Sequence, residues 1–141
     1  MTALPALSDL EEEFLLYEPK SIERYQAIID LGRKLEPMPD ALKTDATKVR
    51  GCSASVWVYP TVLSGDRLHF LADSNAAITK GVVALILAAV QDKPATEVVA
   101  TDIAELLAPF DLTRELSSNR TQGIPNMIAL VRDTATRLAS A

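Results

Sequence analysis

Residues 56–72 read VWVYPTVLSGDRLHFLA, and this stretch decides the fold. Val56 and Val58 alternate with Trp57 and Tyr59, and the same period of two returns in residues 67–72. Ser-Gly-Asp at residues 64–66 is typical of a turn. The pattern predicts an antiparallel hairpin. Because a hairpin alone is marginal in water, helices must cover one of its faces.

Helical spacing on both sides of this hairpin supplies the covering layer. Ser8 and Glu11 form a capping-box pattern, Ser21 is a second candidate N-cap, and Asp73 or Ser74 is expected to cap a long helix that ends before Pro94. The expected helices cover residues 8–17, 21–35, 74–90, 96–99, 102–107 and 124–140. We therefore predict an α+β fold, a small antiparallel sheet covered by helices on one face, as a single domain over residues 1–141.

Composition narrows the class of function. The chain of 141 residues carries a net charge of −5, which argues against nucleic acid as a partner. Its start lacks the basic and apolar regions of a secretory signal, and its longest apolar stretch, residues 81–90, is too short to cross a membrane. We expect a cytoplasmic protein without a membrane partner. The acidic residues Glu11, Glu12 and Glu13 are interpreted as a solvated helix face rather than an interaction face.

Cys52 is the only cysteine, and His69 is the only histidine. One cysteine cannot form an internal disulfide or a dithiol redox couple, and these two residues cannot bind a metal such as zinc unaided. Gly51 precedes Cys52 and small residues follow it, so a partner's atoms could approach the sulfur closely. An inert buried thiol is one interpretation of such a residue. A persulfide relay is the other, because it needs a single thiolate together with a separate donor and acceptor.

Residues 51–57 read GCSASVW, residues 73–81 read DSNAAITKG and residues 116–123 read LSSNRTQG. In these three motifs the chain resembles the SufE family and its close relative CsdE. Residues 51–57, GCSASVW, are similar to the family's Gly-Cys-x-Ser-x-Val-Trp signature. Residues 73–81, DSNAAITKG, are similar to Asp-Ser-Asp-Ala-x-Ile-x-x-Gly, and residues 116–123, LSSNRTQG, match Leu-Ser-x-x-Arg-x-x-Gly. The motifs occur in the family's order and spacing. Ala54 and Asn75 depart from the family pattern, where serine and aspartate are usual.

This resemblance implies a sulfur carrier with the two-layer fold of SufE and IscU-type proteins. Such a protein accepts sulfane sulfur from a PLP-dependent cysteine desulfurase, SufS or CsdA, as a persulfide on Cys52, and stimulates that enzyme. It then passes the sulfur to a scaffold for iron–sulfur assembly of the SufB type. The resemblance implies no cofactor or metal of its own, since PLP belongs to the desulfurase, and it makes Gly51, Ser53, Asp73 and Arg120 partner-binding residues.

Two alternatives stay open at this point. The chain could regulate a desulfurase without carrying sulfur, in which case Cys52 would be dispensable. It could also be a thiol hydrolase in which His69 activates Cys52, which requires the two side chains to lie within hydrogen-bond reach. We expect an accessory protein of sulfur transfer rather than a stand-alone enzyme.

Overall fold

The hairpin supplies two of the strands in a three-stranded antiparallel sheet, whose strand order is β1-β2-β3. The computed structural model describes residues 4–18, 21–49, 55–110 and 123–139. Strand β1 (Val56–Val62) pairs with β2 (Arg67–Ser74), and β2 pairs with the two-residue strand β3 (Lys93–Pro94). In the β1–β2 register Val56 lies opposite Ser74 and Val62 lies opposite Leu68. The predicted α+β fold with a small antiparallel sheet is confirmed.

The described part of the chain contains six α-helices besides this sheet. They are α1 (Leu7–Leu15), α2 (Ile22–Gly32), α3 (Ala77–Val90), α4 (Ala95–Ala100), α5 (Ile103–Leu107) and α8 (Gly123–Ala139). The described residues also form three short 3₁₀ turns, η1 (Asp40–Leu42), η2 (Ser64–Asp66) and η3 (Ala108–Phe110). Of these turns, η2 is the hairpin connection, where Gly65 takes the left-handed φ of 73° that suits glycine.

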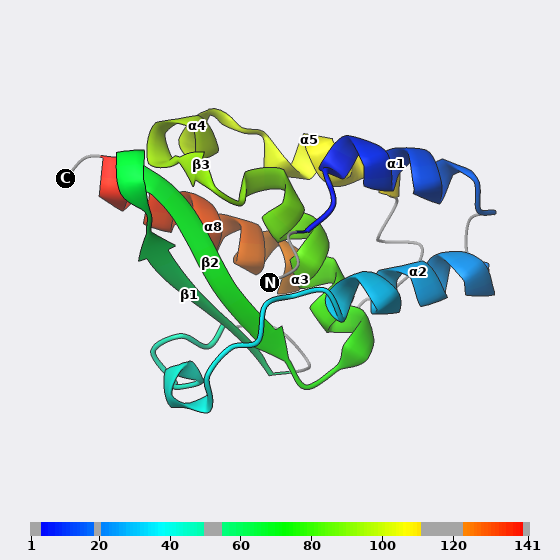
Figure 1. The fold of residues 1–141 in the computed structure, drawn as a ribbon, viewed down its shortest axis with the longest axis horizontal. Coiled ribbons are helices and arrows are strands. Elements are labelled where there is room, and N and C mark those ends of the chain that lie inside the picture. The colour runs from blue at the N-terminus through cyan, green and yellow to red at the C-terminus, as the bar shows by residue number, and fades with distance from the viewer. Residues whose placement is uncertain (1–3, 19–20, 50–54, 111–122, 140–141) are drawn as a thin grey trace.

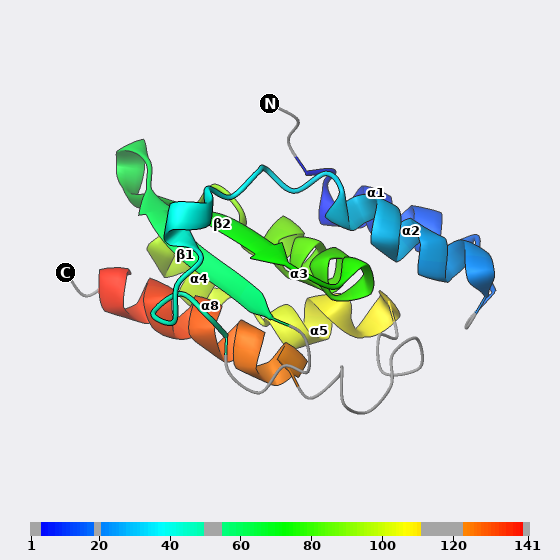
Figure 2. The ribbon, with the colours of Figure 1, turned by 90° about the horizontal axis from the view of Figure 1, so that it is seen from below.

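One face of the sheet belongs to the core, and the opposite face is only partly covered. The core face carries the alternating residues predicted for it, and all are buried: Val56, Val58, Leu68, Phe70 and Ala72. Helices α3 and α8 lie behind this face in Figure 1. Figure 2 shows the hairpin between α8 and the segment that follows α2. The side chains of that second face, Trp57 and His69 among them, are therefore only half-buried.

Helix α3 is the buried centre of the fold, as its nearly continuous apolar sequence predicts. Helix α2 crosses it where Gly32 meets Gly81. A Cβ atom added at Gly81 would overlap the carbonyl oxygen of Ile28 and lie 2.6 Å from its carbonyl carbon. The two helices therefore approach each other as closely as their backbones allow. None of the described helices, α3 included, is long and apolar enough to span a membrane.

Two of the predicted helix starts were wrong. A serine or aspartate side chain can cap a helix, but the sequence alone does not show whether the backbone N–H groups use that cap. Ser21 does cap α2, accepting from the backbone N–H of Arg24. Helix α1 instead begins at Leu7 after Ala6, so Ser8 is not its N-cap. Neither Asp73 nor Ser74 caps α3, because β2 continues through Ser74 and the helix begins only at Ala77.

The strand β3 was not predicted from the sequence. Helix α3 ends at Val90, and Asp92, with a φ of 62°, turns the chain back along β2. The side-chain amide of Gln91 accepts from the backbone N–H of Phe70 at 2.8 Å and donates to the Phe70 carbonyl at 2.9 Å. These two bonds imitate the pairing of one more strand residue beside β3. Pro94 thus lies within the sheet rather than marking the end of α3.

Candidate functional site

The candidate site is the end of the hairpin where β1 begins and β2 stops. The chain reaches this end from Val49 and re-enters the described structure at Ser55. Three predicted site residues, Gly51, Cys52 and Ser53, fall between these points in the sequence and are outside the described residues. Arg120, in another part of the chain, is also outside them. Asp73 is the one predicted site residue that the structure describes.

Backbone pairing fixes both sides of the cysteine-bearing segment to the sheet. The N–H of Val49 donates to the carbonyl of Val56 at 2.8 Å, and the N–H of Val58 donates to Thr47 at 2.9 Å. Lys48 thereby forms an antiparallel bridge with Trp57. Residues 47–49 therefore run beside β1. The described residues on both sides of Cys52 in the sequence, Val49 and Ser55, therefore lie at this end of the hairpin.

Asn75 holds the start of β1 from the other side. Its side-chain oxygen accepts from the backbone N–H of Ser55 at 3.1 Å, and its own N–H donates to the Ser55 carbonyl at 3.2 Å. An aspartate at this position would offer the same Oδ1 acceptor. The departure from the family motif at Asn75 therefore keeps the hydrogen-bonding function and removes a negative charge.

Asp73 lies between two lysines that come from different parts of the chain. Its Oδ2 is 2.7 Å from Lys43 Nζ, and its Oδ1 is 3.2 Å from Lys80 Nζ and accepts from the Ser74 N–H at 2.8 Å. Its side chain is 19% exposed. Asp73 thus ties the segment after α2, the end of β2 and the start of α3 together beside Ser55.

Lys43 makes further contacts in this cluster. It reaches Asp40 Oδ1 at 3.1 Å, and its ammonium group lies 5.8 Å from the centre of the Trp57 ring. Trp57 pairs with Asp73 across the hairpin, so the ring and the carboxylate share the second face of the sheet. The cation–π geometry places a positive charge beside the half-buried ring of Trp57.

The electrostatics of this cluster keep its groups charged. Burial alone would raise the pKa of Asp73, but hydrogen bonds from Lys43, the Ser74 N–H and Lys80 outweigh it and hold that pKa below its usual range. The hydrogen bonds to Asp73 and Asp40 raise the pKa of Lys43. At neutral pH the cluster therefore carries a fixed set of opposite charges.

Sequence reasoning identified Asp73 but not the lysines that bind it. Lys80 falls at a variable position of the second motif, and Lys43 lies thirty residues before Asp73 in a segment without periodicity. No local pattern connects these positions, because the hairpin and α3 bring them together only in the fold. Asp73, expected to contact a partner, makes its described ion pairs within this chain.

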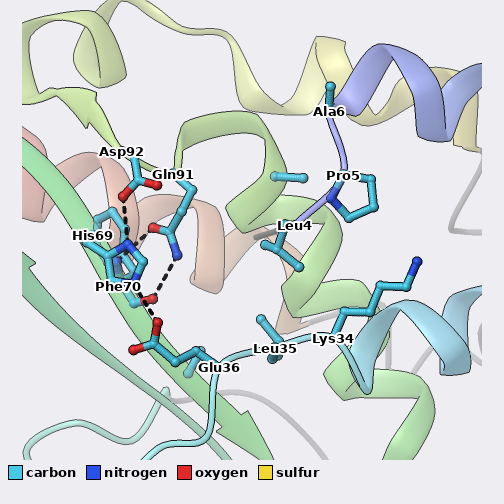
Figure 3. Close-up of a pocket in the computed structure, with 12 residues that line it drawn as sticks. Leu4, Pro5, Ala6, Lys34, Leu35, Glu36, His69, Phe70, Gln91 and Asp92 are labelled. Carbon is cyan, nitrogen blue, oxygen red and sulfur yellow. Dashed lines mark hydrogen bonds and ion pairs between the residues drawn. The ribbon is translucent and has the colours of Figure 1, made fainter. Parts of the chain in front are cut away.

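His69 belongs to a second cluster at the opposite end of the hairpin, where it pairs with Thr61. Its Nδ1 is 2.6 Å from Asp92 Oδ1, and its Nε2 is 3.2 Å from Glu36 Oε1. Figure 3 shows the ring between the two carboxylates, in the wall of a pocket of about 340 Å³. Burial alone would lower the pKa of His69, but the hydrogen bonds to Asp92 and Glu36 raise it above its usual value.

This geometry bears on the hydrolase alternative. A general base needs a free ring nitrogen that faces the nucleophile. Both nitrogens of His69 are taken by carboxylates. In the strand register Thr61 lies five residues beyond Val56, roughly 17 Å along β1. The arrangement therefore gives the Cys52–His69 pairing no support. Among the described residues, no group of three or more His, Cys, Asp or Glu side chains is arranged to hold a metal ion.

Comparison with known proteins gives one consistent result. Residues 9–135 match the SufE family, an Fe-S metabolism associated domain. An uncharacterized SufE-like protein of Rhizobium etli is 33% identical over 98% of this chain and 95% of its own length. The sulfur acceptor protein CsdE of Escherichia coli is 36% identical over 72% of this chain and 69% of its own length.

A solved structure supports the fold independently. The solution structure of a hypothetical protein from Thermus thermophilus covers all of this chain and is itself covered completely, with a TM-score of 0.75. At 15% sequence identity, this likeness concerns the fold alone.

Proposed function

The chain belongs to the SufE family, and from this premise we propose that it is a sulfur acceptor and carrier working through a persulfide on Cys52. The observation that carries the proposal is how the described residues on both sides of the chain's only cysteine are held. Cys52 falls in the sequence between Val49, which is hydrogen-bonded to Val56 of β1, and Ser55, which is hydrogen-bonded to Asn75 just after β2. A carrier needs one thiol next to a stable part of the fold. The hydrogen-bonded residues on both sides of Cys52 in the sequence supply that support.

The proposed reaction is a transfer of one sulfur atom between two thiolates. The Cys52 thiolate attacks the outer sulfur of a persulfide on the donor enzyme. A new S–S bond forms on Cys52 as the donor's S–S bond breaks, and the donor cysteine leaves as a thiolate. Electrons balance without an added oxidant or reductant. Delivery repeats the same exchange, with the acceptor's thiolate attacking the outer sulfur on Cys52.

The proposed donor is a PLP-dependent cysteine desulfurase of the SufS or CsdA type, which the carrier stimulates by removing its sulfur. The proposed acceptor is a SufB-type scaffold of iron–sulfur assembly. The E. coli relative is a sulfur acceptor protein by name, which supports this assignment. Gly51, Ser53, Asp73 and Arg120 are the proposed partner-binding residues, and the protein is proposed to act in the cytoplasm.

Mass spectrometry of the intact protein tests the proposal. Incubation with a SufS-type desulfurase and free cysteine should add one sulfur atom, which a thiol reductant removes. Cys52→Ser should gain no sulfur. A double variant, Cys52→Ser with Ser64→Cys, moves the only thiol to the exposed turn at the far end of the hairpin and should gain far less than the wild type.

The same variants separate the competing functions when desulfurase activity is measured beside the added mass. Full stimulation of the desulfurase by Cys52→Ser would contradict the carrier role and favour a regulator that does not carry sulfur. Equal sulfur loading of the relocated thiol would show that any exposed cysteine suffices. That result would remove the reason for placing the reaction at this end of the hairpin.

A further inference from the structure

A groove between α1 and α2 lies apart from the cysteine end of the hairpin. The two helices run antiparallel at one end of the molecule (Figure 1). Residues from both helices line a groove of about 620 Å³. Its floor is apolar and includes Leu10, Phe14 and Leu31, which also belong to the core. We refer to this feature as the α1–α2 groove.

A buried arginine makes the groove a fixed part of the fold. Arg24, only 4% exposed, donates from Nη2 to the carbonyl of Phe14 at 2.9 Å and to that of Tyr17 at 3.4 Å. Its Nη1 donates to the Phe110 carbonyl at 3.4 Å. The guanidinium thus satisfies carbonyls at the C-terminus of α1 from within α2. The ring of Phe14 packs edge-on against that of Phe110, with the ring centres 5.0 Å apart, and this contact holds α1 against the core.

One large apolar side chain stands exposed in the wall of this groove. Ile22 is 84% exposed, whereas Leu15 and Leu16 at the end of α1, although 65% and 83% exposed, do not line the groove. Ile22 therefore adds exposed apolar area beside the apolar floor, which a partner could cover.

The charges that line the groove are mainly negative. Among the described residues that line it, four are charged: Glu13, Glu23 and Asp30 are acidic and Lys34 is basic. Asp30 also pairs with Arg33 at 3.4 Å on the exposed surface of α2. Glu13 and Glu23 come from opposite walls, so acidic groups flank the apolar floor on both sides. Of the acidic run of residues 11–13, only Glu13 lines the groove.

We propose that the α1–α2 groove is a docking surface for an amphipathic basic helix of a partner protein. A third helix lying between two antiparallel helices would cover the apolar floor and the exposed side chain of Ile22 with its own apolar stripe. Lysine or arginine residues beside that stripe would meet the acidic walls. The inference rests on neither Cys52 nor the carrier function, so it can fail while sulfur transfer stands.

A designed peptide probes this surface directly. The probe is a labelled Leu/Lys peptide of about 14 residues with leucine at i, i+3, i+4 and i+7. A scrambled peptide of the same composition lacks the apolar stripe. Fluorescence anisotropy at near-physiological salt should show binding of the amphipathic peptide and at least about tenfold weaker binding of the scrambled one.

Matched variants locate the binding. Glu23→Lys and Ile22→Ser change exposed residues and should each weaken peptide binding about fivefold to tenfold. Their controls are Glu97→Lys on α4 and Val62→Ser on β1, which make the same kinds of change at exposed positions outside the groove and should leave binding unchanged. Circular dichroism would verify that all four variants keep their helices.

Three outcomes would overturn the proposal. The first is equal binding of both peptides, which would indicate attraction to net charge alone. The second is an equal loss of binding in the groove variants and their controls. The third is a wild-type dimer in sedimentation equilibrium that Ile22→Ser converts to a monomer, since the groove would then bind a second copy of this chain.

Discussion

At each end of the β1–β2 hairpin, one ionisable side chain lies between two side chains of opposite charge, and the signs are reversed between the two ends. At the end beside Ser55, the carboxylate of Asp73 lies between the ammonium groups of Lys43 and Lys80. At the turn end, the imidazole of His69 lies between the carboxylates of Asp92 and Glu36. Both clusters attach the segment that follows α2 to the sheet.

The difference between the clusters is their response to pH. The lowered pKa of Asp73 and the raised pKa of Lys43 leave both groups charged throughout the neutral range. The unperturbed pKa of histidine is about 6.5, and the hydrogen bonds to Asp92 and Glu36 raise the pKa of His69 above it, so the charge of this ring decides whether it attracts its two carboxylates. The end that anchors the cysteine segment is therefore insensitive to neutral pH, and the opposite end responds to it.

The largest effect should come from removing the central carboxylate. Asp73→Ala leaves two lysine ammonium groups facing each other, and we expect it to lower the free energy of unfolding by about 1–2 kcal/mol. Urea denaturation measures the loss, and Asp133→Ala, an exposed change on α8, is the control. Because the pKa of Asp73 is depressed, its contribution is present above the unfolded-state pKa of about 3.9 and is lost below it.

The Asp73 deficit should therefore stay constant between about pH 6 and pH 9. Asp73→Asn should be intermediate, since the amide keeps an acceptor for the Ser74 N–H but loses the charge. If Asp73→Ala were as stable as the wild type, the lysines would have found other partners at no cost. That result would contradict a stabilising role for Asp73 at this end of the hairpin.

A smaller and pH-dependent effect is expected at the other end. His69→Asn should cost about 0.5–1 kcal/mol at pH 6 and less at pH 9. The folded-state pKa of His69 is raised, so its contribution is complete below the unfolded pKa of about 6.5 and disappears as pH rises through the folded value. Urea midpoints of the wild type and the variant across this range measure the change. A deficit that grows with pH would reverse the sign and exclude the assigned charge state.

The smallest effect should come from restoring the family residue at Asn75. Asn75→Asp keeps the acceptor for the Ser55 N–H, so its free energy of unfolding should lie within about 0.5 kcal/mol of the wild type. Asn75→Ala removes that acceptor and should cost about 0.5–1 kcal/mol. Thermal or urea unfolding of the pair measures both. Equal losses in the two variants would mean that the amide nitrogen of Asn75, rather than its oxygen, stabilises this end.

The parts of the fold that sequence predicted are those encoded by local periodicity. The hairpin and the buried α3 follow from patterns within about fifteen consecutive residues. Strand β3 did not follow, because Lys93 and Pro94 become a strand only through their pairing with β2. The starts of α1 and α3 were wrong because the sequence offered serine or aspartate caps that the backbone does not use.

The candidate site divides in the same way. A single cysteine beside glycine and the motifs around it can be recognised along the chain, and they led to Cys52, Asp73 and Arg120. The lysines that bind Asp73 could not be recognised, since long-range folding creates those contacts. The pairing of His69 with Glu36 and Asp92 could not be predicted for the same reason.

The side chain of Gln91 has a consequence for aggregation. The edge of a short sheet offers unpaired amide and carbonyl groups to which a strand of another molecule can add. Here β3 occupies that edge of β2 at Arg67 and Leu68, and the Gln91 amide occupies the next pairing position, Phe70, in both directions. One glutamine thereby extends the protected edge beyond the two residues of β3. A foreign strand would have to displace it before the chain could join a growing β-aggregate.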